Sequence, residues 1–137
     1  MIKVTLIGAG SAVFTLQLIA YLLRFTELAD IEIPFHDVGG SRLDVVEATA
    51  CQVNERFDTR ATITVSCDRK AALGGSEFVI NMTQVGGIEA TRKDLLIPAT
   101  YGLNQVIGDI TGVGGIFRAL GSLLPEALRV EVPTEAL

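Results

Sequence analysis

The sequence predicts an α/β protein with a doubly wound parallel sheet, and three observations support this fold class. Short β-branched runs alternate with runs whose apolar residues recur at helical spacing. The first apolar run, Ile2–Ile7, passes directly into a Gly-x-Gly turn, and a helical pattern follows the turn. Hydrophobic residues make up 49% of the 137 residues and charged residues 20%, which suits strands buried on both faces. We therefore expect parallel strands joined by crossover helices in a single domain.

The turn after the first strand is a candidate dinucleotide-binding site. A strand, a Gly-x-Gly turn and a helix form the arrangement that such a turn requires, although the third glycine of the strict pattern is replaced here by Val13. Gly8 suits the tight turn, and Gly10 would let the backbone approach a pyrophosphate. The amides that would face the phosphates from the helix N-terminus belong to Ser11, Ala12, Val13 and Phe14.

The uncharged run over residues 4–23 could also be a signal peptide or a membrane span. The polar and glycine residues that interrupt it favour a soluble protein, and we expect no membrane association.

A second strand is expected over Ile31–His36, and Asp37 follows it. This acid lies close to the offset of about 20 residues at which a carboxylate meets the adenosine ribose hydroxyls. Such a carboxylate would repel a 2′-phosphate, so it favours NAD over NADP. Since Gly39-Gly40-Ser41 follows directly, Asp37 could instead be a helix cap or a turn residue.

Periodicity also predicts the elements that follow Asp37. Apolar residues three and four apart predict a helix over residues 43–57, with Ser41 as its N-cap. A third strand is expected over residues 61–66, and a short helix or turn over residues 68–73. His36, the only histidine, has no second ligand at metal spacing and is interpreted as an ordinary strand residue.

The fourth strand is expected over residues 78–80, ending at Asn81. In a doubly wound sheet this strand should lie beside the first, so its end faces the cofactor crevice. Asn81, Met82 and Thr83 would then approach the nicotinamide half of the cofactor.

The last part of the chain is rich in glycine. Residues 85–87 form a glycine loop, and a helix is expected over residues 88–96, broken at Ile97-Pro98. Several glycines then surround Asp109. Taken alone, this pattern is typical of a crossover loop with a capping acid.

Composition excludes several classes of function. The net charge is −5, from 11 basic and 16 acidic residues without a basic cluster, so nucleic acid is not an expected partner. Cys51 and Cys67 have no metal-binding spacing and are expected to be reduced thiols in a cytoplasmic protein.

Residues 2–120 resemble the NAD- and divalent-metal-dependent glycosidases of glycoside hydrolase family 4. The late glycine-rich block is most similar to the α-galactosidase branch of this family. The α-glucosidase and α-glucuronidase branches remain alternative assignments. The resemblance rests on Ile7-Gly8-Ala9-Gly10-Ser11 with Phe14, Asp37 with Arg42-Leu43, Asn81 with Val85-Gly86-Gly87, Ile97-Pro98 with Tyr101-Gly102-Leu103 and Gln105, and Gly108-Asp109 with Gly112 to Leu120.

The resemblance implies a Rossmann-like fold and an unusual hydrolytic reaction, in which bound NAD+ takes hydride from C3 of an α-glycoside. A base then removes the C2 proton while a metal, usually Mn2+, stabilises the enediolate, and the glycosidic oxygen leaves. The resemblance also implies that Arg42 belongs to the cofactor site, Asp109 to the catalytic and substrate site, and Arg92 to the substrate site.

The family's metal ligands and base lie beyond the segment that matches. We therefore expect residues 1–120 to be an NAD-binding domain, truncated before the second domain, with residues 121–137 as a divergent tail. The chain is expected to be inactive alone, to contain no metal site and to form homo-oligomers through exposed apolar surface. Two alternatives stay open: an NAD-binding module without hydrolase activity, and an oxidoreductase similar to lactate and malate dehydrogenases.

Overall fold

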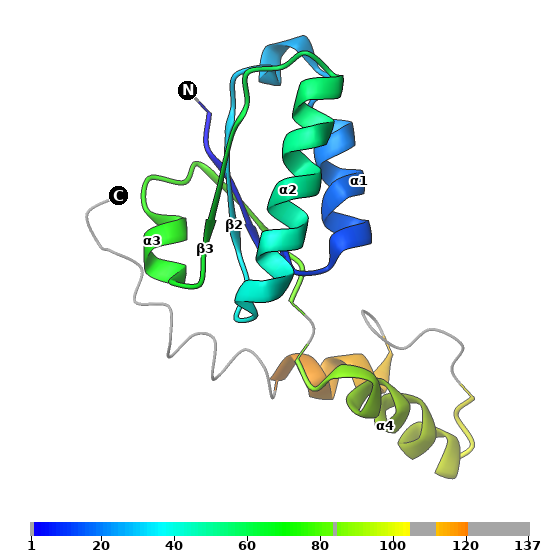
Figure 1. The fold of residues 1–137 in the computed structure, drawn as a ribbon. Helices are drawn as coiled ribbons and strands as arrows, with labels where there is room; N and C mark the ends of the chain where they lie inside the picture. The colour runs from blue at the N-terminus through cyan, green and yellow to red at the C-terminus, as the bar shows by residue number, and fades with distance from the viewer. Residues whose placement is uncertain (1, 84, 105–111, 121–137) are drawn as a thin grey trace. The chain divides into compact units, whose positions relative to one another are not determined.

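The structure, a computed structural model, describes residues 2–83, 85–104 and 112–120. Its first compact unit, residues 1–83, is built on a parallel sheet in the order β3-β2-β1-β4 (Figure 1). The doubly wound arrangement predicted from the sequence is confirmed, and the fourth strand lies beside the first. The strands are β1 (Val4–Ile7), β2 (Glu32–His36), β3 (Thr62–Ser66) and β4 (Phe78–Asn81).

The helices of this unit cover both faces of the sheet (Figure 1). α1 (Ala12–Leu22) and α2 (Gly40–Arg56) pack side by side on one face, whereas the short α3 (Arg69–Leu73) lies on the other. A single 3₁₀ turn, η1 (Thr26–Leu28), follows α1. The core between the sheet and the two long helices is apolar and includes Leu6, Ile19, Ile33, Phe35, Leu43, Val46 and Ala50.

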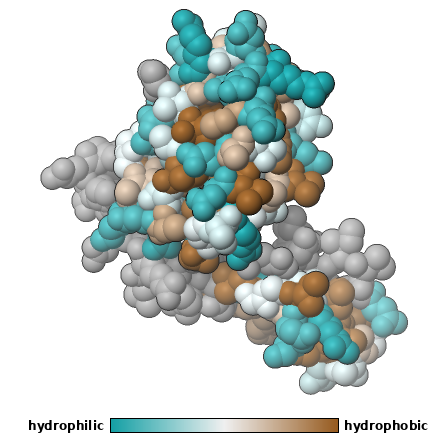
Figure 2. Space-filling model, in the orientation of Figure 1, coloured by the Kyte–Doolittle hydropathy of each residue, from teal (hydrophilic) through white to brown (hydrophobic). Residues whose placement is uncertain are grey.

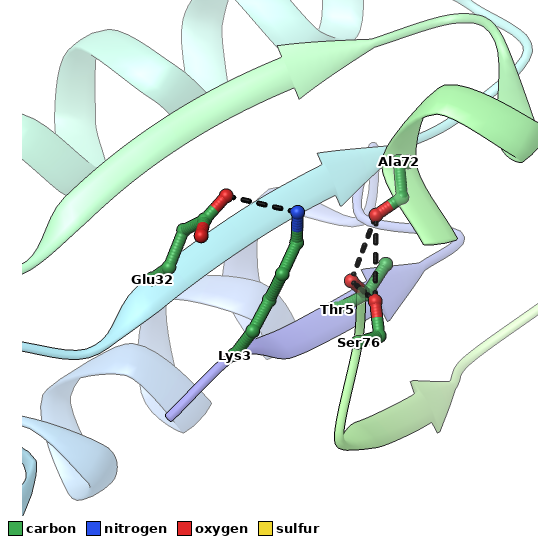
Figure 3. A network of polar contacts seen from close by, with 5 residues as sticks. All are labelled: Lys3, Thr5, Glu32, Ala72 and Ser76. Atoms are coloured by element: carbon green, nitrogen blue, oxygen red, sulfur yellow. Dashed lines mark hydrogen bonds and ion pairs between the residues drawn. The ribbon is translucent and has the colours of Figure 1, made fainter. Parts of the chain in front are cut away.

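β1 is one of the two interior strands of the sheet, and all four of its residues are buried. Its one polar side chain, Thr5, is fully buried and faces α3. The Thr5 hydroxyl donates to the carbonyl oxygen of Ala72 over 3.0 Å and lies 2.6 Å from the Ser76 hydroxyl (Figure 3). A buried hydroxyl needs such partners, so the network joins β1 to α3 and to the α3–β4 connection.

Charged residues lie outside this core. At the start of β1, Lys3 forms a 2.9 Å ion pair with Glu32 of β2 (Figure 3). On the surface shown in Figure 2, hydrophilic side chains predominate around the top of the first unit, and apolar side chains gather across its middle. Exposed apolar residues of α1 include Val13 and Phe14, which are 73% and 50% exposed.

Two expectations about helix boundaries are wrong. α2 begins at Gly40 with Gly39 as its N-cap, so Ser41 lies inside the first turn and does not cap the helix. The amides of Arg42 and Leu43 already point to the Gly39 carbonyl oxygen, over 3.1 and 3.3 Å. The helix starts early because the Asp37 carboxylate holds the Gly39 amide.

The second error concerns Pro98. The second unit, residues 84–137, contains α4 (Gly87–Thr100), which continues through Ile97 and Pro98. Proline removes one helical donor, yet α4 continues for two residues beyond Pro98. The helix ends at Thr100, and Gly102 just beyond it has a φ of +80°. The Gly102 amide donates to the Ala99 carbonyl oxygen, and the Leu103 amide donates to that of Pro98. These two bonds form a Schellman motif.

The second unit also contains a helical segment over residues 113–120. Arg118 of this segment forms an ion pair with Asp94 of α4, and both side chains are largely buried. Gly114 lies against the backbone of Asp94, where a Cβ atom would come within 2.5 Å of the Asp94 carbonyl oxygen. A side chain at position 114 would therefore separate the two helices.

None of the described helices is long and apolar enough to cross a membrane.

Candidate dinucleotide-binding site

The glycine turn between β1 and α1 is anchored to the end of β2. The carbonyl oxygen of His36 accepts two hydrogen bonds, from the amides of Gly8 over 2.8 Å and Ala9 over 3.0 Å. On its other side, the turn accepts from Thr15: the Thr15 hydroxyl donates to the Ala9 carbonyl oxygen over 2.8 Å. Thr15 and Ala9 are both fully buried, so the conformation of the turn is set by the protein itself.

Asp37 lies over this turn and joins it to the start of α2. One carboxylate oxygen accepts from the Gly10 amide over 2.9 Å, and the other accepts from the Gly39 amide over 3.1 Å. The Asp37 side chain is still partly exposed. A carboxylate has about four acceptor positions, so the two that remain can accept from hydroxyl groups outside the protein.

Gly8 marks the point where the turn meets the end of β4. Its φ is +83°, which disfavours any residue with a side chain. A Cβ atom at Gly8 would also lie 2.9 Å from the Thr83 nitrogen and 3.0 Å from the Met82 carbonyl carbon. The sheet therefore brings the turn together with the residues predicted to approach the nicotinamide.

These residues after β4 are held in an ordered arrangement. The Met82 amide donates to the Ile7 carbonyl oxygen over 2.8 Å, which extends the pairing of β4 with β1 past Asn81. The Asn81 side-chain oxygen accepts from the Thr83 amide over 3.0 Å and from the Thr83 hydroxyl over 2.7 Å. Asn81 and Thr83 are exposed at the carboxyl edge of the sheet.

The first turn of α1 offers free donors at the same edge. Ser11 is the N-cap, and its side chain makes no capping hydrogen bond. The first helical bond runs from Thr15 N to Ser11 O over 3.0 Å, so the amides of Ala12, Val13 and Phe14 have no carbonyl partner within the described residues. Unpaired amides at a helix N-terminus bind anions well.

Arg42, another predicted site residue, adjoins the glycine turn, since its Cβ would lie 3.3 Å from a Cβ atom placed on Gly10. Arg42 is exposed on the first turn of α2, where its guanidinium lies beside Gly39, 3.2–3.6 Å from the position of a Cβ there. Arg92 is exposed on α4 of the second unit, and Asp109 lies outside the described residues.

The described residues do not fit a manganese site. No three His, Cys, Asp or Glu side chains gather there in a way that could hold a metal ion. Cys51 and Cys67 are free and exposed, and His36 is buried with its Nδ1 3.0 Å from the Ser66 carbonyl oxygen.

Two contributors to the site were not predicted from the sequence. The His36 carbonyl could not be found, because a backbone acceptor leaves no pattern. Thr15 did leave a signal: it shares a helix face with Ile19 and Leu23 at intervals of four residues, and all three are buried. A polar residue on an apolar helix face indicates a buried hydrogen bond.

An open parallel sheet with a glycine turn after its first strand and an acid at the end of its second strand defines a Rossmann-like α/β protein. Sequence comparison assigns it more narrowly. Residues 3–127 match the family described as "Family 4 glycosyl hydrolase". The chain belongs to this family, and the lactate and malate dehydrogenase alternative is set aside.

Individual relatives agree with this assignment. The chain is 37% identical over 124 residues to an α-galactosidase of Bacillus subtilis (strain 168), and 35% identical over 114 residues to one of Rhizobium meliloti (strain 1021). These alignments cover 90% and 83% of the chain but 29% and 23% of the two enzymes. The chain thus spans less than a third of the length of these relatives.

A solved structure extends the comparison to three dimensions. The 6-phospho-β-glucosidase of Thermotoga maritima, solved with manganese, NAD+ and glucose-6-phosphate, superposes with a TM-score of 0.75 at 28% identity. The match covers 94% of this chain and 30% of that enzyme.

Proposed function

We propose that residues 8–14, Asp37 and residues 81–83 bind NAD, and that the chain supplies the cofactor-binding part of a glycosidase of the α-galactosidase type. The observation that carries the cofactor proposal is the Asp37 carboxylate, which lies over the glycine turn with acceptor positions to spare. The α-galactosidases among the relatives support the activity, and the NAD-bound Thermotoga maritima enzyme supports the cofactor.

The chain's own residues can hold each part of NAD. Asp37 accepts from the adenosine ribose hydroxyls, and its negative charge repels a 2′-phosphate. The free amides of Ala12, Val13 and Phe14 bind the pyrophosphate. Arg42, exposed beside Gly39, completes the adenosine side of the site.

The exposed ends of Asn81 and Thr83 orient the nicotinamide half of the cofactor. When bound, NAD supplies a hydride acceptor. The residues of this chain position that acceptor, and Asn81 and Thr83 supply polar groups at the carboxyl edge of β4.

The sugar-binding role of the protein rests on other residues. We propose that Asp109 and Arg92 contact an α-glycoside substrate, in line with their match to the family pattern. Since the described residues do not fit a manganese site, no step of the reaction is assigned to a metal held by them.

Calorimetric titration of the 137-residue chain with NAD+ and with NADP+ tests the cofactor proposal. We expect one NAD+ per chain and a clearly weaker affinity for NADP+. Equal affinity for the two cofactors, or no binding of either, would contradict it.

A further inference from the structure

Gly10 occupies a position that its own backbone does not require to be glycine. Gly8 has a positive φ angle, but Gly10 does not. An L-amino acid with a side chain can therefore adopt the backbone conformation of residue 10. The reason for a glycine must therefore lie in the space around its Cα atom.

That space is filled by Asp37. A Cβ atom at position 10 would lie 2.6 Å from Asp37 Oδ2 and 2.8 Å from its Cγ, closer than real Cβ atoms approach other atoms. The next neighbour, the Cβ of Arg42, would be 3.3 Å away and needs only a small shift. The same Oδ2 atom accepts the Gly10 amide, so the carboxylate lies on top of residue 10.

A Cβ atom at position 10 could be accommodated only if the Asp37 side chain moved away from the turn. Its carboxyl group is the far end of a short side chain, so it would move more readily than the backbone. Moving it would break the hydrogen bonds from the Gly10 and Gly39 amides, which are the contacts that hold the carboxylate over the turn.

We propose that Gly10 is a positioning residue for Asp37: the missing side chain admits the carboxylate over the turn, and this contact sets the preference for NAD over NADP. The inference rests on the proposed cofactor site. It departs from the expectation that a glycine here serves the approach of the pyrophosphate, because the nearest obstacle to a side chain is the acid that faces the ribose.

The two roles predict different behaviour in a double-mutant cycle of Gly10→Ala and Asp37→Ala, titrated calorimetrically with NAD+ and NADP+. If Gly10 positions Asp37, Gly10→Ala lowers NAD+ affinity by about tenfold or more, the size expected for one charged hydrogen bond. Gly10→Ala also lowers the ratio of NAD+ to NADP+ affinity to the ratio measured for Asp37→Ala. The double variant then binds NAD+ no more weakly than Asp37→Ala does. If Gly10 serves the pyrophosphate, both cofactors weaken equally, the preference is unchanged and the two effects add, which overturns the proposal.

Urea unfolding of the same four proteins tests the contact without any cofactor. Gly10→Ala should destabilise the parent chain, whereas in the Asp37→Ala background it should cost no more than Gly74→Ala does. Gly74 is a matched control, since its φ of −55° suits alanine and its nearest neighbour would be an ordinary 3.5 Å away.

The unfolding cycle also decides the cases in which binding is lost. If Gly10→Ala fails to fold and the double variant folds, the contact is supported. Failure of both variants, or an equal cost in both backgrounds, overturns it. If the parent chain binds neither cofactor, the proposed function is wrong, while the unfolding cycle still decides whether Gly10 makes room for Asp37.

Discussion

The hydroxyl of Thr15 donates a 2.8 Å hydrogen bond to the carbonyl oxygen of Ala9, and both residues are fully buried. This bond joins the first turn of α1 to the glycine turn. Replacing Thr15 by valine keeps the shape but leaves a buried carbonyl without its partner. We expect a loss of about 1–3 kcal/mol in the free energy of unfolding, measured by urea denaturation.

Thr49→Val is the matched control for this change. The Thr49 hydroxyl also bonds a backbone carbonyl over 2.8 Å, that of Val45, but it does so on the exposed side of α2. We expect a change within about 0.5 kcal/mol. Equal losses in the free energy of unfolding of the two variants would show that the buried Thr15 bond stabilises the chain no more than the exposed Thr49 bond does.

Asp58 stores strain at the end of α2. Its φ is +53°, and two bonds complete a Schellman motif there: Asp58 N to Glu55 O, and Thr59 N to Asn54 O. Glycine adopts this conformation without a side-chain penalty, so Asp58→Gly should stabilise the chain by about 0.5–1 kcal/mol. Asp58→Ala retains the strain and should not stabilise it. A lower unfolding midpoint for the glycine variant would contradict this explanation.

The Asp94–Arg118 ion pair should hold the described helices of the second unit together. Arg118→Met leaves a largely buried carboxylate unpaired and should cost about 3 kcal/mol. Replacing both residues by apolar ones, in Asp94→Leu with Arg118→Met, should cost less than either single change. Hydrogen exchange of the α4 amides measures the effect, and the account fails if the double variant exchanges fastest.

Sequence patterns predicted the strands well, because each short strand-forming run ends at a glycine or a polar residue. Ile7, His36 and Asn81 were expected as strand ends, and the structure pairs Ile7 with both His36 and Asn81. Boundaries that depend on contacts distant in the chain were missed. Ser41 was a plausible cap by residue type, but the Asp37 side chain reaches Gly39 and starts α2 earlier.

The same limit applies to the candidate site. The acid at Asp37 and the glycines of the turn were found from their spacing, since that spacing is a local property of a strand–turn–helix unit. The contact between Gly10 and Asp37 was not, because it joins residues that only the parallel pairing of β1 and β2 brings together.

Asp37 should contribute to NAD+ affinity the free energy of one charged hydrogen bond to the ribose hydroxyls. Asp37→Ala should weaken NAD+ binding by about 1.5–3 kcal/mol, which is about ten- to 150-fold. Asp44→Ala removes the same charge from an exposed position on α2 and should leave the affinity unchanged. Calorimetry compares the two variants; a similar effect of both would point to net charge alone.

The most direct test of the account is an amide NMR titration of the 137-residue chain with NAD+. We predict that the amide signals of Ala12, Val13 and Phe14 shift in a saturable way, since these unpaired donors bind the pyrophosphate. Signals of residues 57–61, which precede β3 at the opposite edge of the sheet, should not move. Shifts confined to that opposite edge, or no saturable shift at residues 12–14, would contradict the assignment of the glycine turn as the cofactor site.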